Sequence, residues 1–313
     1  MSRSDVTFDS AGIRLAGHLY LPGTPSDSPR PALVVSHPGS GVKEQAAGLY
    51  ARLLSERGYV TLAFDAAFQG ESGGEPHGQE DPAHRVEDIK AAVSYLTTRE
   101  EVDPDRIGVL GICASGGYVL TASASDHRIK AIATVSGVDI ARQFRFGADG
   151  TQDPSVFQAM LDAAATARSA LARGEDSQQT FPIFPRTEDE ARTMGGAHGA
   201  DGFSYYCSPR AFHPRSAKFF TWTSVDRMAT FDAFYDIPLI GQRPTLFIVG
   251  REAVTAWMAV EAFQRITGPK EIIWVEGASH VDLYDKPEYV DPAIEKLTEF
   301  YGAHLGAEKA AAV

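Results

Sequence analysis

The segment GVLGICASGGY, residues 108–118, contains one of the two cysteines of this 313-residue chain. It begins in an apolar run that is typical of a buried strand, and a predicted helix starts at about Ser115. Cys113 therefore falls at a sharp turn between a strand and a helix. Such a turn exposes the side chain at its apex beyond the end of a sheet, where a reactive group is accessible.

Strands and helices are predicted in alternation on both sides of this segment. Unbroken apolar runs such as ALVVSH at 32–37 are typical of strands buried on both faces, and helical periodicities separate them. The pattern predicts an α/β fold with a mostly parallel sheet and helices on both faces. After a hairpin at 5–21, the predicted strands are 32–37, 59–65, 106–112, 129–136, 244–250 and 271–277, and the predicted helices are 46–57, 86–96, one from 115, 155–173, one from 254, and 291–304.

The alternation stops near residue 140 and returns near residue 242. Between 141 and 241 no buried strand run occurs, and we expect a mainly helical insertion that covers the carboxyl ends of the strands as a lid. Its stretch 203–222 is rich in aromatic side chains, which either grip an apolar substrate or form the core of the lid. The predicted domains are a core in two parts, 1–140 and 242–306, the lid at 141–241, and a disordered Ala-rich tail at 307–313.

The composition narrows the class of protein. With 43% hydrophobic and 22% charged residues, the sequence is that of an ordinary globular protein with an ample core. The net charge of −12 argues against nucleic acid as a partner, because phosphate binding needs basic patches. We therefore expect a small-molecule ligand.

Several sequence signals are missing. The amino terminus lacks a signal-peptide pattern, and no segment has the ~18 consecutive apolar residues of a membrane span. We expect a cytoplasmic protein with no membrane contact. No His, Cys and Asp cluster has metal-ligand spacing, and no dinucleotide or Walker motif follows a strand, so we expect no metal and no cofactor.

Reactive side chains follow the predicted strands one after another. In an open α/β sheet, ligands bind beyond the carboxyl ends of the strands. A cysteine, carboxylates and a histidine at that edge are the parts of a nucleophilic triad, in the chain order nucleophile, acid, histidine. The residues after the strands are His37 to Gly41, Asp65, Cys113, Gly137 and Asp139, Arg251 and Glu252, and His280.

Together these segments resemble the α/β-hydrolase superfamily over nearly the whole chain. GICAS at 111–115 is similar to its nucleophile elbow, with cysteine in place of the usual serine and Ser115 in place of the last glycine. Cysteine at this position is similar to dienelactone hydrolases. The fuller pattern more closely resembles a dienelactone-hydrolase-like branch that includes fungal polyketide transferases: HPGSGVKEQ (37–45), GESGGEP (70–76), GICASGGY (111–118), SPRAFHPRS (208–216) and GASHVDLYD (277–285).

The resemblance implies a role for each matching residue. Cys113 is the nucleophile, activated as a thiolate by His280 and by the positive end of the following helix, so its pKa is expected below the free value of about 8.5. His280 is the base, and later the acid that protonates the leaving group. The backbone N–H of Ala114, with that of Gly39 or Ser40, forms the oxyanion hole.

The acid of the triad departs from the family pattern. The usual carboxylate lies three residues after the glycine that closes its strand, and that residue is Ala253 here. Glu252 is our first choice, Asp139 is the alternative acid, and either is also interpretable as a solvated loop charge. Asp282 and Tyr284 are expected to position the histidine loop. If neither acid reaches the histidine, a Cys–His dyad is chemically sufficient.

Other interpretations of these residues stay open in the sequence. Cys113 is alternatively a small buried hydrophobic residue, since unpaired cysteines are among the most buried side chains. Ser115 is the nucleophile if the elbow is shifted to Cys113-x-Ser115-x-Gly117. His280 is otherwise a loop histidine at the end of a strand.

The predicted function is hydrolysis of ester, lactone or thioester bonds of a small acyl substrate through an acyl intermediate on Cys113. The alternative is an acyl (polyketide) transferase that passes the same intermediate to an alcohol, because a lid that excludes water favours another acceptor. A hydrolase fold that binds a ligand without catalysis is the alternative from another class. The sequence leaves the substrate and the oligomeric state open, a homodimer included.

Overall fold

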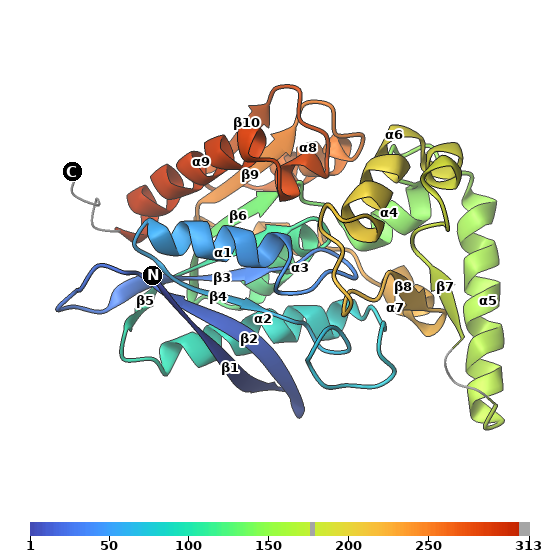
Figure 1. The fold of residues 1–313 in the computed structure, drawn as a ribbon, viewed down its shortest axis with the longest axis horizontal. Helices are drawn as coiled ribbons and strands as arrows, with labels where there is room; N and C mark the ends of the chain where they lie inside the picture. Colours follow the sequence, from blue (N-terminus) through green and yellow to red (C-terminus); the bar gives the residue numbers. More distant parts are fainter. Residues whose placement is uncertain (176–178, 307–313) are drawn as a thin grey trace.

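The computed structural model describes residues 1–175 and 179–306, and its centre is an eight-stranded sheet (Figure 1). The strand order is β1 (Ser2–Ser10), β2 (Ile13–Leu21), β4 (Val60–Phe64), β3 (Arg30–Ser36), β5 (Val102–Ile112), β6 (Ile129–Val135), β9 (Thr245–Gly250) and β10 (Lys270–Val275). β2 pairs antiparallel with β1 and β4, and all other pairs are parallel. The predicted α/β fold is confirmed, and the expected tail at 307–313 lies outside the described residues.

Helices cover both faces of this sheet. In β3, Leu33 and Val35 point to one face and Val34 points to the other, which is the period of two in a strand that is buried on both sides. α1 (Ala46–Glu56) and α9 (Pro287–Leu305) pack on the first face, and α2 (Pro82–Thr97), α3 (Ser115–Ser125) and α8 (Ala256–Arg265) pack on the second.

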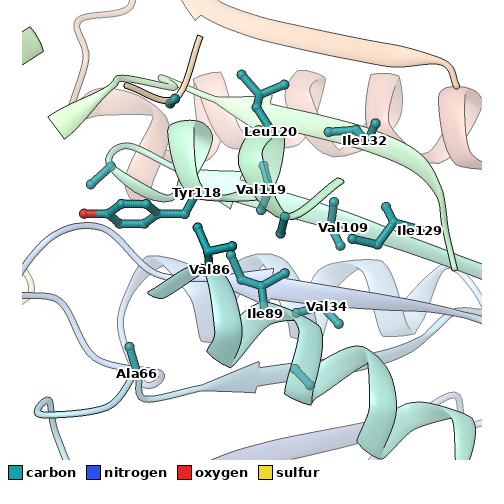
Figure 2. Packing of buried hydrophobic residues seen from close by; sticks show 14 of the residues in the cluster. Val34, Ala66, Val86, Ile89, Val109, Tyr118, Val119, Leu120, Ile129 and Ile132 are labelled. Atoms are coloured by element: carbon teal, nitrogen blue, oxygen red, sulfur yellow. The ribbon is translucent and has the colours of Figure 1, made fainter. Parts of the chain in front are cut away.

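The core on the second face holds the strand and the helix that flank Cys113. Figure 2 shows Val109 of β5 and Ile89 of α2 in this cluster together with Val119 of α3. All three side chains are fully buried. Because full burial of such a side chain contributes about 1.5–3 kcal/mol, the end of β5 and the start of α3 are held firmly relative to each other.

The segment between β6 and β9, which we call the insertion, lies on the side of the sheet away from the two chain termini (Figure 1). Its two short strands form an antiparallel pair of their own. The insertion consists of α4 (Ile140–Phe146), α5 (Pro154–Ala172), β7 (Thr180–Pro182), α6 (Glu188–Cys207), β8 (Phe219–Thr221), α7 (Thr223–Ala229) and η1 (Ile237–Ile240).

The helix α6 was not among the predicted helices, although the insertion was expected to be mainly helical. Its residues show no apolar periodicity, and the helix is interrupted at Gly195 and Gly196, where the backbone angles are not helical. A local signal was present: the Thr187 hydroxyl accepts a hydrogen bond of 3.2 Å from the N–H of Glu190. Thr187 is thus an N-cap, and the sequence T-x-x-E is that of a capping box.

Candidate active site

Cys113 lies at the apex of the turn between β5 and α3. Its φ angle is +56°, in the left-handed region that a residue with a side chain occupies only when the surrounding structure enforces it. The flanks must be small, because a Cβ added to Gly111 would lie 2.1 Å from the Ser115 carbonyl oxygen. One added to Gly116 would lie 2.5 Å from Gly137 Cα. These two glycines therefore permit the tight turn that places Cys113 at its strained apex.

The backbone N–H groups of Ala114 and Gly39 lie near the Cys113 sulfur, where both lower the pKa of the thiol. Both were expected as oxyanion-hole donors. The other candidate, Ser40, lies one residue further along the loop, where its carbonyl accepts a hydrogen bond of 2.9 Å from the hydroxyl of Ser216 in the insertion. Donors fixed by the backbone need no reorganisation when negative charge develops on a bound carbonyl oxygen.

Tyr284 stands between His280 and Cys113. Its hydroxyl is 2.9 Å from His280 Nε2, and it lies near enough to the Cys113 thiol to lower the pKa of that thiol. The single turn η2 (Asp282–Tyr284) brings the phenol back beside the imidazole four residues after the histidine. The phenol of Tyr284 therefore lies between the imidazole of His280 and the sulfur of Cys113.

The other ring nitrogen of His280 pairs with a hydroxyl. Thr255 Oγ1 is 2.6 Å from His280 Nδ1, and both residues are buried. Glu252 is exposed, and Asp139 caps the start of α4 and accepts a further hydrogen bond from Ala233. Among residues 1–175 and 179–306, no hydrogen bond joins either carboxylate to His280. Neither predicted acid is therefore brought to the histidine, and Thr255, which the sequence analysis missed, occupies that place.

Burial sets the charge states of the thiol and the imidazole. It raises the pKa of the Cys113 thiol, against the lowering effect of the Tyr284 hydroxyl and the two backbone N–H groups. Burial also lowers the pKa of His280 well below the usual range, and the nearby His198 lowers it further. At neutral pH both groups are therefore neutral. The expectation of a lowered thiol pKa was wrong, because the effect of burial on this pKa is larger than that of the polar groups around the sulfur.

Ser115 occupies a structural position behind the turn. Its hydroxyl donates to the His37 carbonyl at 2.6 Å, and Arg85 Nη2 donates to the same carbonyl at 2.6 Å. These two donors fix the start of the loop that carries Gly39. Because Ser115 is fully buried whereas Cys113 lines a cavity, the fold does not support the shifted elbow.

The cavity beside Cys113 has a volume of about 270 Å³, and its walls are mostly apolar. One wall comes from the core, with His280 and Tyr284, and the opposite wall comes from the insertion. Of the aromatic residues at 203–222, Tyr206 and Phe220 line this cavity, whereas Phe212 is exposed. Four other residues of the insertion also line the cavity: Phe144, Met194, Gly195 and His198.

Arg210 binds the insertion to the loop that carries His280. Its guanidinium donates to Asp285 at 2.6 and 2.9 Å and to Asp201 of α6 at 2.9 Å. Asp201 also accepts a hydrogen bond from the hydroxyl of Ser279. Because paired hydrogen bonds from a guanidinium to a carboxylate fix both partners, the carboxyl-terminal half of α6 is anchored to the histidine loop.

Residues 1–175 and 179–306 contain no group of three or more His, Cys, Asp and Glu side chains placed to hold a metal ion. No helix within these ranges is both long enough and apolar enough to cross a membrane.

The turn at Cys113 lies in the middle of a sheet whose last strand leads to a histidine at the same cavity, and this arrangement is that of the α/β-hydrolases. Comparison with known families is more specific. The chain belongs to the family described as X-Pro dipeptidyl-peptidase (S15 family), whose sequence model matches residues 11–282.

Similar proteins occur in bacteria. The chain is 38% identical to the Uncharacterized protein YcjY of Escherichia coli (strain K12), over 96% of this chain and 99% of that protein. The crystal structure of the hypothetical protein PA2218 from Pseudomonas aeruginosa has 34% sequence identity and a TM-score of 0.89. The alignment covers 97% of this chain and 94% of that one.

Fungal proteins are more distant relatives. The Acyltransferase drtE of Aspergillus calidoustus is 27% identical, over 87% of this chain and 86% of its own length. The Polyketide transferase claH of Penicillium crustosum is 25% identical, over 94% and 95%. The α/β hydrolase GrgF from Penicillium sp. sh18 shares the fold with a TM-score of 0.82 at 21% identity, covering 98% of this chain and 100% of that one. The resemblance to α/β-hydrolases and to fungal polyketide transferases is confirmed.

Proposed function

We propose that this enzyme cleaves esters, lactones or thioesters through an acyl intermediate on Cys113. The observation that carries the proposal is the position of the sulfur, which lines the cavity and lies near the backbone N–H groups of Ala114 and Gly39. A substrate carbonyl whose carbon is in contact with that sulfur would have its oxygen close to both donors.

Acylation of Cys113 would use the Tyr284 hydroxyl as a relay. As the sulfur attacks, the thiol gives its proton to this hydroxyl, and Tyr284 passes its own proton to His280 Nε2, 2.9 Å away. The bond from carbon to sulfur forms, and the bond from carbon to the leaving group breaks. The imidazolium then returns the proton to the leaving alkoxide or thiolate by the same path, so the step needs no cofactor.

Thr255 would hold His280 in the tautomer that this step needs. When His280 Nδ1–H donates to the Thr255 hydroxyl, 2.6 Å away, Nε2 is left as the proton acceptor. A hydroxyl orients the ring as a carboxylate would, but it adds no negative charge to stabilise an imidazolium. The proton therefore stays on the sulfur until the substrate binds, which avoids a permanent ion pair in a buried site.

The cavity favours an uncharged, apolar acyl group. None of the described residues that line it is Asp, Glu, Lys or Arg, and Phe144 and Phe220 contribute aromatic surface. An apolar cavity without an opposite charge binds a charged acyl group poorly, because the group loses part of its hydration without compensation. We therefore propose aliphatic or aromatic acyl groups as substrates, with the insertion acting as the lid over them.

Acyl transfer to an alcohol is the second candidate function. It is supported by the insertion that lines the cavity beside Cys113, because a lid that closes over the acyl group would limit the access of water, and by two fungal relatives that are named as transferases. Hydrolysis and transfer would share the acyl intermediate and differ only in the acceptor.

Intact-protein mass spectrometry with a panel of nitrophenyl esters, lactones and acyl thioesters tests the proposal. The wild type should gain the mass of one acyl group on the Cys113 peptide and release a burst of leaving group. Neutral acyl groups should react faster than dicarboxylic ones. If the protein binds such compounds with no acylation and no turnover, it is a ligand-binding protein with a hydrolase fold.

A further inference from the structure

We propose that His198 of α6 is the base that activates the acceptor in the second half-reaction. We further infer that a hydroxyl compound reaches it through an open cavity on the far side of α6. This inference rests on the proposed function, because it concerns the breakdown of the acyl intermediate on Cys113.

His198 lies against the catalytic histidine, and both rings line the cavity. The two rings meet edge to face with their centroids 5.2 Å apart, and His198 lines the same cavity as Cys113. Among the described residues, no hydrogen bond occupies either nitrogen of the His198 ring. Burial lowers the pKa of His198, against a smaller raising effect of Asp201, so the ring is neutral at neutral pH and able to accept a proton.

Both ring nitrogens of His280 already have hydrogen-bond partners. Its Nδ1 pairs with Thr255 at 2.6 Å, and its Nε2 pairs with Tyr284 at 2.9 Å. A proton from an incoming hydroxyl can reach His280 only through the Tyr284 hydroxyl, by the path that the leaving group uses in acylation. His198 offers a ring nitrogen that can take this proton directly.

A second cavity, of about 550 Å³ and open to solvent, adjoins the first at α6. Met194, Gly195 and His198 line both cavities, so this part of α6 is the partition between them. The far wall comes from residues 147–152, which include Asp149, Thr151 and Gln152. The volume greatly exceeds the ~30 Å³ share of one water molecule, so an organic alcohol fits as well as water.

The bonds in the proposed step balance without another reactant. The acceptor hydroxyl gives its proton to His198 while its oxygen bonds to the acyl carbon, and the N–H groups of Ala114 and Gly39 hold the oxyanion. The bond from that carbon to the Cys113 sulfur then breaks. The thiolate takes a proton from water and His198 returns one to water, so both groups end neutral.

Stopped-flow kinetics of His198→Ala with nitrophenyl hexanoate tests this step. The burst, which reports acylation, should stay within about twofold of the wild type. Breakdown of the acyl enzyme should slow by about 100-fold, the lower end of the range for a general base. Added imidazole should restore breakdown, which a merely structural role would not allow. His127→Ala, at an exposed histidine outside both cavities, is the matched control and should match the wild type.

A second arm adds glycerol or benzyl alcohol to the wild type. Faster breakdown with an ester product is expected if organic hydroxyl compounds use the second cavity. Release of the free acid alone at an unchanged rate would overturn the proposal of an organic acceptor and would identify water as the acceptor.

Three results separate failure of this inference from failure of the proposed function. Unchanged breakdown in His198→Ala, or equal slowing of burst and breakdown, overturns the role of His198 while the acyl intermediate stands. Absence of an acyl enzyme in the wild type overturns the proposed function itself. If His198→Ala does not fold, His198→Gln replaces it, because the amide fills the site but accepts no proton.

Discussion

The two walls of the cavity beside Cys113 are built in opposite ways. On the core side, the Cys113 carbonyl accepts hydrogen bonds from Gly116 at 2.8 Å and Val138 at 2.9 Å, and the flanking helix is packed into the core. On the insertion side, α6 breaks at Gly195 and Gly196, and a Cβ added at either would meet no described atom within 4 Å.

This difference separates the chemistry from the selection of substrates. The core wall holds the sulfur and its N–H donors in a strained conformation that only dense packing maintains. The insertion wall is anchored by Arg210 at the carboxyl-terminal half of α6 and is loosely packed at the glycines. A wall of this kind adapts to different acyl groups and acceptors without disturbing the nucleophile.

The largest effect is expected on the core wall, at the sulfur itself. Cys113→Ala should lower kcat/KM for a nitrophenyl ester by about 10⁴-fold or more, because it removes the atom that forms the intermediate. Ser115→Ala is the matched control, and it should keep most of the activity and lose only about 1 kcal/mol of stability, because the His37 carbonyl keeps its hydrogen bond from Arg85. An inactive Ser115→Ala with an active Cys113→Ala would mean that the elbow is misassigned.

Tyr284→Phe tests the link between the sulfur and the histidine. Without the hydroxyl, His280 Nε2 loses its partner at 2.9 Å, and no group carries the proton from the thiol. We expect the burst rate to fall by about 100-fold at neutral pH while the phenyl ring keeps the packing. The loss should shrink at high pH, where the thiol ionises without help. A burst rate equal to that of the wild type would show that His280 reaches the sulfur directly.

The core wall was predictable from the sequence because its signals are local. The apolar runs and the small residues on both sides of Cys113 follow from what a buried parallel strand and a tight turn require. The residue that pairs with His280 was not predictable by counting residues from Gly250, the glycine that closes β9. The N–H of Glu252 donates to the Ala278 carbonyl at 2.9 Å in the turn after β9, while its side chain is exposed. The partner of His280 is a hydroxyl, which a search for carboxylates misses.

The insertion wall was predictable only in outline. Glycines and polar residues dominate α6, so the usual hydrophobic face is missing, and only the capping box at Thr187 marks the start of the helix. The role of Tyr284 had a usable signal, its spacing of four residues from His280. That spacing suggested only that Tyr284 supports the loop that carries His280. The position of its hydroxyl beside the Cys113 sulfur could be recognised only in the structure.

The pH dependence of alkylation is the next test. Because burial raises the pKa of Cys113, the thiolate is a minor species at neutral pH and becomes more abundant as the pH rises. The rate of labelling by iodoacetamide should increase about tenfold per pH unit, and the rise should continue beyond pH ~8.5, the value of a free cysteine. Peptide mapping against Cys207, whose pKa is also raised by burial, provides the comparison. A rate that levels off below pH ~7 would mean that the thiol is already ionised at neutral pH.

The smallest effect is expected at the break in α6, where two adjacent glycines provide their own control. Gly196 has φ +60° and ψ −147°, a combination that is essentially restricted to glycine, whereas Gly195 has φ −129° and ψ 15°. Alanine at 196 would be strained by about 1–3 kcal/mol, and the open space around the break lets the backbone shift to relieve it.

That shift would move His198, two residues further along, without touching the core wall. Gly196→Ala should therefore slow breakdown of the acyl enzyme by about three- to tenfold, a loss of about 1 kcal/mol in transition-state stabilisation, and leave the burst unchanged. Gly195→Ala should change neither rate, because its backbone angles suit alanine and the added methyl group meets no described atom. Equal effects of the two substitutions on burst and breakdown would show that the insertion wall acts on the nucleophile as well. In that case the two walls form one rigid unit, and the division between chemistry and selection does not hold.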